Sequence, residues 1–343
     1  MPYHRTVKNR KYILAVILII SFMFVRELPV LAAVPRDLSG VDLEREARKE
    51  GKLVFYTSFT MTEAVAIVES FQKKYPFIKV ELYRLSNEQI LARIPAEQRA
   101  GRNTADVIQL KGDGISFFKK NGMLSRYASP ERKFYADGFK DKEGYWTDTF
   151  TSVYSVVYNT RLVSPHDVPA TYKDLLRPQW KGKIGFNSNN HMWAEAVMQI
   201  MGKEEGIKYL EALSRQKPIA RSGGTITVML TAAGEYAFAV PVNDSQAEPV
   251  KIKGAPIDWV GLKPYYGDLH PISLVANAPH PYAAQIFIDY FLSQEGQSMV
   301  MKLGKTPSRK GLKSKIRVEE INAIDPTLDG EYYKKLMKQI FRS

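Results

Sequence analysis

The sequence predicts an α/β fold made of two doubly wound lobes. Strand-like and helix-like segments alternate through most of the chain, 343 residues are enough for two domains of ordinary size, and no low-complexity linker separates them. The composition, 45% hydrophobic and 25% charged, can fill a core and excludes global disorder. We therefore expect two lobes between which the chain crosses more than once.

The first part of the chain follows a β-α-β-α-β order. Apolar residues at helical spacing, from Ala64 to Phe71, follow a short buried strand and a capping residue, Thr60 or Thr62. This order predicts a mostly parallel sheet with helices on both faces. The expected strands are 53–56, 78–82 and 106–110, and the expected helices are 64–74, 87–100 (interrupted or bent near Pro95) and 115–120.

The second part continues the alternation. Pro281 marks the first turn of the clearest helix, whose apolar stripe runs from Ile286 to Phe291. Near the end, Tyr332, Leu336 and Ile340 indicate a further helix over 331–341. The other expected strands are 153–158, 183–186, 236–240, 257–260 and 272–276, and the other expected helices are 172–176, 193–201 and 225–233.

The first 33 residues have the three parts of a secretory signal peptide. Basic residues between Arg5 and Lys11 precede an apolar run, Ile13–Val25, and Val30–Ala33 offers small side chains for cleavage. The alternative is a membrane anchor, but this run is shorter than the roughly 20 residues that a spanning helix needs. We expect residues 1–33 to be removed and the mature protein to lie in the periplasm.

Composition also narrows the function. The absence of cysteine excludes disulfides, thiolate metal sites, a cysteine nucleophile and a lipid-anchored cysteine. The formal net charge is +13 for the whole chain and +9 without the predicted leader. A basic charge can indicate nucleic-acid binding, but export removes nucleic acid as an ordinary partner. The remaining charge suits an anionic ligand or a membrane-proximal protein.

Six motifs occur in a recognisable order. They are Glu50–Ser58 (EGKLVFYTS), Thr104–Val107 (TADV), Val157–Thr160 (VYNT), Trp180–Gly185 (WKGKIG), Ala278–Ala284 (APHPYAA) and Phe291–Gln297 (FLSQEGQ). In order and spacing the series resembles family-1 extracellular solute-binding proteins, in the ferric-iron-type branch that serves ABC importers. The resemblance covers about residues 43–312.

This resemblance implies a type II periplasmic binding protein fold, in which two lobes close around a ligand by hinge motion. It implies a monomer without a resident cofactor, which captures a small-molecule or ferric ligand and docks on an ABC permease of the inner membrane. We expect residues 34–150 and 272–312 in lobe 1, residues 151–271 in lobe 2, and residues 313–343 as a C-terminal helical segment on either lobe.

Ligands of such sheets gather beyond the carboxyl ends of the strands, which selects several loops. The loop at Arg221–Thr225 combines a cation, two glycines and two hydroxyls at a helix start, which is typical of an anion site. Simple capping or turn formation is the alternative for each loop. The candidate ligand-binding residues are Ser58, Thr60, Lys111, Asp113, Asn187, Ser188, Asn189, Trp193, Arg221, Ser222, Gly223, Thr225, Asn243 and Tyr266, with Trp193 or Tyr266 covering an apolar part of the ligand.

Metal binding is a separate question. The resembling ferric-binding proteins use a His, a Glu and a Tyr pair where this chain has Phe59-Thr60, Lys111-Gly112 and Val242-Asn243, so these hard-metal ligands are missing. Tyr266, Asp268 and His270 are spaced i, i+2, i+4 and would share one face of an extended segment. They are the candidate metal ligands, and the alternative is an aromatic hinge segment.

The function expected from these residues is capture of a small anionic or metal-bearing solute. The ligand could be a ferric–anion complex, a phosphonate, an organic phosphate or a carboxylate. No motif of a serine hydrolase or zinc protease is present. The competing hypotheses are an exported enzyme and a ligand-sensing partner built on the same two-lobed fold.

Overall fold

The computed structural model describes residues 40–341, so the predicted leader lies outside the described range. Within it, no helix is long and apolar enough to cross a membrane. The α-helices are α2 (Val41–Glu50), α3 (Met61–Lys74), α4 (Asn87–Arg99), α5 (Gly112–Lys120), α6 (Trp193–Met201), α7 (Lys203–Arg215), α8 (Gly224–Ala233), α9 (Asp244–Ile252), α10 (Pro281–Leu292), α11 (Gln294–Lys302) and α12 (Gly330–Phe341).

The strands form one sheet of mixed direction. They are β1 (Lys52–Thr57), β2 (Lys79–Arg84), β3 (Val107–Gln109), β4 (Leu124–Ser125), β5 (Thr147–Asn159), β6 (Ile184–Asn187), β7 (Ile219–Arg221), β8 (Phe238–Asn243), β9 (Ile257–Gly261), β10 (Tyr265–Val275), β11 (Thr306–Pro307) and β12 (Ile321–Ala323). Five short 3₁₀ helices are η1 (Pro130–Phe134), η2 (Pro165–Asp167), η3 (Tyr172–Leu176), η4 (Pro178–Trp180) and η5 (Val318–Glu320).

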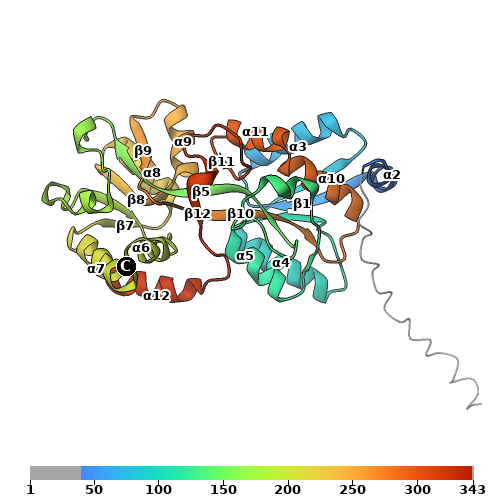
Figure 1. Cartoon of the computed structure of the whole chain (residues 1–343), viewed down its shortest axis with the longest axis horizontal. Helices are drawn as coiled ribbons and strands as arrows, with labels where there is room; N and C mark the ends of the chain where they lie inside the picture. Colours follow the sequence, from blue (N-terminus) through green and yellow to red (C-terminus); the bar gives the residue numbers. More distant parts are fainter. Residues whose placement is uncertain (1–39, 342–343) are drawn as a thin grey trace, which may run out of the picture. The chain divides into compact units, whose positions relative to one another are not determined.

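The strand order is β2-β1-β3-β10-β5-β8-β6-β7, with β4, β9, β11 and β12 paired off this path. Parallel pairs lie towards both ends, where β1 pairs β2 and β3 and where β6 pairs β7 and β8. In the middle, β10 and β5 are antiparallel to each other and to their outer neighbours β3 and β8. The prediction of a mostly parallel sheet is therefore wrong for the centre of the sheet, where the two long strands β5 and β10 run antiparallel to each other (Figure 1).

The long strand β5 divides the sheet into two groups. Its residues up to Val153 pair with β10, whereas those from Tyr154 onwards pair with β8 and β9. We call β1–β4 with β10–β12 the first strand group, and β6–β9 the second strand group. The lobe boundaries expected from the sequence stay a prediction.

Local sequence explains why the first helices begin where they do. Thr60 and Ser86 are the N-caps of α3 and α4, and each forms a capping box with the residue three positions later, Glu63 or Gln89. The apolar residues predicted for α3 are buried. The predicted interruption near Pro95 is absent, since α4 runs as one helix and buries that proline together with Ile90 and Ile94.

Aromatic packing fixes the helices on the sheet. On the first strand group, Phe71 of α3 meets Phe287 of α10 edge to face, with ring centroids 4.9 Å apart, and Phe55 of β1 lies beneath them. On the second strand group, Phe186 and Trp193 belong to a core cluster that also takes in α7 and α12. These cores hold the loops at the strand ends in place.

Candidate functional site

A cleft of about 960 Å³ opens where the first strand group, the second strand group and the central strands meet. The starts of α3 and α4 line one side, the start of α8 and one face of α9 line the other, and β5 and β10 contribute side chains between them. Its polar lining consists of Ser58, Thr60, Thr62, Glu63, Arg84, Ser86, Asn87, Glu88, Ser152, Thr225, Ser245, Gln246, Lys253, His270 and Lys305.

Two cationic side chains, Arg84 and Lys305, line this cleft on the side of the first strand group. Arg84 ends β2 and donates from Nε to the Phe59 carbonyl at 3.2 Å, and no carboxylate in residues 40–341 pairs with it. Lys305 is 8% exposed at its side chain, and its Nζ lies 3.0 Å from Glu63 Oε1. The guanidinium of Arg84 is therefore the freer of the two positive groups.

The other oxygen of Glu63 has a structural task. Its Oε2 accepts from the Thr60 amide at 3.0 Å, which completes the cap of α3. The ammonium of Lys305 also lies 4.7 Å from the centre of the Phe150 ring, within cation–π range. Lys305 is thus held by a carboxylate and a ring before any ligand arrives.

A short polar chain on β5 and β10 lies against the cleft. His270 stacks flat on Phe150, with centroids 4.0 Å apart and ring planes 9° apart. Its Nε2 lies 3.0 Å from Ser152 Oγ, which lies 2.8 Å from Ser245 Oγ on α9. Burial, then the nearby Lys111 and Lys305, lowers the pKa of His270 well below its usual value. The ring is therefore neutral, and it supplies hydrogen bonding rather than charge.

The start of α8 leaves backbone donors available. Its N-cap is Gly223, which has no side chain to cap the helix, whereas α3, α4 and α9 all have capping boxes. Thr225, in the first turn of α8, lines the cleft. Uncapped amides and the positive end of a helix favour an anionic group at this place.

The predicted site residues divide into three sets. Ser58, Thr60 and Thr225 line the cleft, and their role as ligand contacts stays a prediction. A second set ties loops to each other: Asn187 Oδ1 accepts from the Gly223 and Asn189 amides, both at 3.2 Å, Ser188 Oγ donates to the Arg221 carbonyl, and Asn243 bridges Asn190 and the Ser152 carbonyl. The third set lies elsewhere, and it includes Trp193 and Arg221.

Trp193 is 2% exposed and packs against Tyr172 and Tyr209 in the core. It therefore cannot cover a ligand in this arrangement. Arg221, which the sequence suggested as the main cation, is exposed on strand β7 and donates to the neighbouring Ala220 carbonyl. Ser222 beside it is exposed as well, and neither residue lines the cleft.

The predicted metal ligands do not form an open set. Asp268 Oδ1 accepts from Tyr154 Oη at 2.6 Å, and Asp268 Oδ2 pairs with Lys111 Nζ at 3.0 Å. Burial opposes the charge of Lys111, but Asp268 and Asp113 outweigh it and raise the pKa of that lysine. Asp268 thus serves an internal ion pair, in which an ammonium stands where a metal ion would need to approach.

The three candidate ligands also face different surroundings. Asp268 borders a small cavity of about 30 Å³ with Lys111 and Asp113. His270 borders the large cleft, whereas Tyr266 packs against the core cluster of the second strand group. Within the described residues, no cluster of three His, Asp or Glu side chains is placed to hold a metal. The residues present do not fit a resident metal ion.

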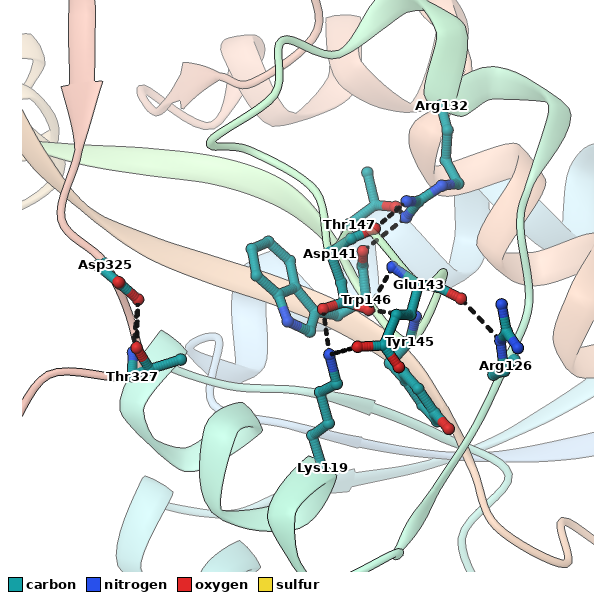
Figure 2. A network of polar contacts seen from close by, with 10 residues as sticks. All are labelled: Lys119, Arg126, Arg132, Asp141, Glu143, Tyr145, Trp146, Thr147, Asp325 and Thr327. Carbon is teal, nitrogen blue, oxygen red and sulfur yellow. Dashed lines mark hydrogen bonds and ion pairs between the residues drawn. The ribbon is translucent and has the colours of Figure 1, made fainter.

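A second concave surface contrasts with the cleft. A groove of about 870 Å³ lies beside α5, and two of its cations, Lys119 and Arg132, are already engaged (Figure 2). Lys119 Nζ lies 2.6 Å from Asp141 and 3.2 Å from Glu143, and Arg132 donates to the Trp146 carbonyl and to Thr147 Oγ1, both at 2.7 Å. The groove is lined only by residues 116–146 and 323–327, whereas the cleft takes residues from the sides of both strand groups and from several strand ends, so we place the candidate site in the cleft.

Sequence reasoning missed Arg84, Lys305 and the Ser152–Ser245 pair. Arg84 lies two residues beyond the predicted strand 78–82 and two before the capping Ser86, so the strand-end rule could have selected it. Lys305 follows α11 in a segment that resembles only the end of a phosphate-binding loop. The contact between Lys305 and Glu63 joins residues far apart in the sequence, so no local pattern predicts it.

Comparisons with known proteins agree with this architecture. Residues 102–323 match the family model described as bacterial extracellular solute-binding protein. A Haemophilus influenzae protein, described as uncharacterized, is 24% identical over 282 residues, which cover 78% of this chain and 80% of that protein.

Three solved structures show the same fold. Iron-bound HitA from Pseudomonas aeruginosa has a TM-score of 0.70 at 20% identity, covering 84% of this chain and 99% of its own. AfuA from Actinobacillus pleuropneumoniae with exogenous fructose-6-phosphate gives 0.65 at 22%, covering 85% and 97%. IdiA (FutA) from Trichodesmium with iron and citrate gives 0.68 at 20%, covering 85% and 98%.

These matches confirm the two-lobed α/β fold and the resemblance read from the motifs. The family and its fold neighbours are binding proteins rather than enzymes. The chain belongs to the bacterial extracellular solute-binding protein family, which implies a small-molecule ligand, a periplasmic location and an ABC permease as partner.

Proposed function

We propose that this protein captures a small organic anion in the cleft and delivers it to an ABC permease. The observation that carries the proposal is Arg84, a guanidinium that lines the cleft and has no carboxylate partner in the described chain. A guanidinium donates two parallel hydrogen bonds to a phosphate, phosphonate or carboxylate group, which makes these groups the expected ligand chemistry.

The rest of the cleft suits such a ligand. Lys305 lies on the same side as an ammonium paired with Glu63, and the uncapped start of α8 offers backbone amides across the cleft. Ser58, Thr60, Thr225 and Ser245 supply hydroxyls for the neutral part of the ligand. A phosphorylated sugar satisfies both requirements, and AfuA, which shares this fold, was solved with fructose-6-phosphate bound.

A ferric–anion complex is the second candidate, because HitA and the Trichodesmium protein were solved with iron. Iron bound through protein ligands alone is disfavoured, since Asp268 pairs with Lys111 and His270 contacts Ser152. A ferric complex would have to bring its own oxygen ligands and present a carboxylate to Arg84. We therefore rank it below a purely organic anion.

The test compares thermal unfolding of the full mature protein with fructose 6-phosphate, a phosphonate, citrate and ferric citrate. A ligand at about 100 times its dissociation constant adds about 2.7 kcal/mol to the free energy of unfolding, so a true ligand gives a clear rise in Tm. We expect the organic anions to raise Tm. A rise with ferric citrate and none with citrate alone or the other anions would support the second candidate.

Two arginine variants decide which cation matters. Arg84→Gln should weaken binding of the identified anion by about 10- to 100-fold, the loss expected for a charged hydrogen bond, in isothermal titration. Arg221→Gln is the matched control, because Arg221 lies outside the cleft. Loss of affinity in Arg221→Gln with none in Arg84→Gln would contradict the placement of the site.

A further inference from the structure

The C-terminal residues 324–341, which we call the strap, contact both strand groups. They follow directly after residues 102–323, the segment that matches the family model. In Figure 1 the segment leaves β12 near the central strands and ends in α12 beside α6 and α7. Its course can be followed in three steps.

The strap starts on the first strand group. β12 pairs in parallel with Tyr265–Gly267 of β10, and the Ile324 amide continues this pairing with a bond of 3.0 Å to the Gly267 carbonyl. Ile324 itself is 4% exposed. Its side chain packs in the core cluster of the second strand group, so the backbone hydrogen bonds to β10 are what fix this end of the strap to the first strand group.

The middle of the strap is a structured turn that touches both sides. Asp325 Oδ1 accepts from the amide and from the hydroxyl of Thr327, both at 2.8 Å. The Pro326 β-carbon lies 3.0 Å from where a β-carbon on Gly112 of α5 would stand. A β-carbon on Gly330 would in turn lie 3.4 Å from His191 Nε2, just before α6. The turn thus lies between the starts of α5 and α6.

The end of the strap is anchored on the second strand group. Asp329 caps α12 through the Glu331 amide at 3.0 Å, and α12 buries Tyr333 and Met337. Tyr333 Oη donates to Glu195 of α6. The Phe341 ring stacks on Phe186 of β6, with centroids 4.0 Å apart. Of the stripe read from the sequence, Leu336 and Ile340 pack against this core, whereas Tyr332 is 41% exposed.

The strap is a third connection between the strand groups. The other two are β5 itself and the link from β9 to β10 at residues 261–265. The strap differs from them because it is fixed at both ends and has only the turn 325–329 between its anchors. A short segment of this kind limits how far its two anchor points can separate, since each residue spans at most about 3.6 Å.

We propose that the strap sets the widest opening of the two strand groups and so pre-organises the cleft between them. Restricting the ligand-free protein to partly closed arrangements reduces the cost of closure on binding. The inference needs only the two-lobed fold and the strap contacts, so it does not depend on which ligand the cleft takes.

The experiment measures a distance in the ligand-free protein. Because the chain has no cysteine, Glu69→Cys on α3 and Glu235→Cys after α8 place two nitroxide labels at exposed positions without competing sites. Inserting Gly-Ser-Gly after Thr327 lengthens the strap by up to about 11 Å while both anchors remain. We expect the electron–electron distance distribution to broaden towards longer distances by several ångströms.

Control variants separate the strap from general loosening. The same insertion after Gly101, in an exposed turn, should leave the distribution unchanged. Tyr333→Ala releases the buried anchor and should broaden it, whereas Tyr332→Ala, which truncates a tyrosine 41% exposed on the same helix, should not. An unchanged distribution in the lengthened strap, with circular dichroism showing an intact fold, would overturn the proposal.

Discussion

Gly185 shows how a single residue supports the loop before α6. A β-carbon on Gly185 of β6 would lie 2.3 Å from Cδ2 of Tyr236, which is 3% exposed and cannot move freely. Gly185→Ala should therefore lower the free energy of unfolding by about 1–3 kcal/mol, the usual cost of overpacking. Urea unfolding measures this loss.

Gly138→Ala provides the comparison for Gly185. Its new β-carbon would meet the Ala323 β-carbon at 3.6 Å, an ordinary contact, and its backbone is not in the left-handed region. We expect less than about 0.5 kcal/mol for this variant. Equal losses in both variants would show that the steric argument for Gly185 is wrong.

The candidate site could be predicted only in part at this scale. Ser58, Thr60 and Thr225 follow from the rule that ligands gather at strand ends, and all three line the cleft. The chemistry of Trp193 and Arg221 favours them as ligand contacts, yet Trp193 is buried in the core and Arg221 lies on strand β7, outside the cleft. The local sequence gives the type and spacing of residues. Which side chains meet in the cleft depends on how distant segments pack in the fold.

At the scale of elements, the cap of α3 separates a structural from a functional role for Thr60. Its hydroxyl accepts from the Glu63 amide, so Thr60→Ala should cost about 1 kcal/mol of stability. Thr60→Ser keeps the cap and should be close to neutral in chemical denaturation. Thr62→Ala, at an exposed first-turn position that also lines the cleft, is the control.

Ligand affinity completes this comparison. Because Thr60 also supplies a hydroxyl to the proposed ligand, Thr60→Ala should weaken binding of the identified anion as well as lower stability, whereas Thr60→Ser should keep both. An unchanged dissociation constant in Thr60→Ala would show that Thr60 is purely structural. A matching loss of affinity in Thr60→Ser would instead show that the threonine methyl group contacts the ligand. A stability loss in Thr62→Ala equal to that in Thr60→Ala would contradict the capping assignment.

Most elements could be predicted because their periodicity is local. The strand from Leu53 and the helix with Ala64 and Phe71 stand where their patterns place them. The sequence patterns do not predict α2, α7, α9 or α11. For α9 the reason is local, because it contains Pro249 and begins directly after Asn243, which the strand-end rule assigns to a ligand loop. The antiparallel centre also escaped prediction, because strand direction follows from how β5 and β10 cross between the groups.

For the whole molecule, the buried carboxyls beside β11 govern how stability responds to pH. Burial raises the pKa of Asp148 to about 7 and that of Asp244 to about 6, although Ser308 and Thr306 donate to them. In the unfolded chain an aspartate has a pKa of about 3.9. The stability that these groups contribute is therefore present below about pH 4 and is lost as pH rises through 6 and 7.

His270 acts in the opposite sense. Its pKa is lowered in the folded protein, so its contribution to stability is present above about pH 6.5 and is lost as pH falls and the unfolded chain takes up the proton. The pH profile of the intact protein is the sum of both effects. A single-site comparison is needed to isolate the carboxyl contribution.

Asp148→Asn removes one of these carboxyls with little change in shape. Relative to the parent protein, the variant should gain stability between pH 5 and pH 8, because only the parent must ionise a buried group. A shift of about three pKa units corresponds to at most about 4 kcal/mol. Urea unfolding at both pH values measures the difference, with Asp137→Asn, 98% exposed at its side chain, as the control. If the free energies of unfolding of the parent and of Asp148→Asn changed with pH in parallel, the pKa of Asp148 would not be raised. Water entering the junction of the two strand groups would then be hydrating this carboxylate.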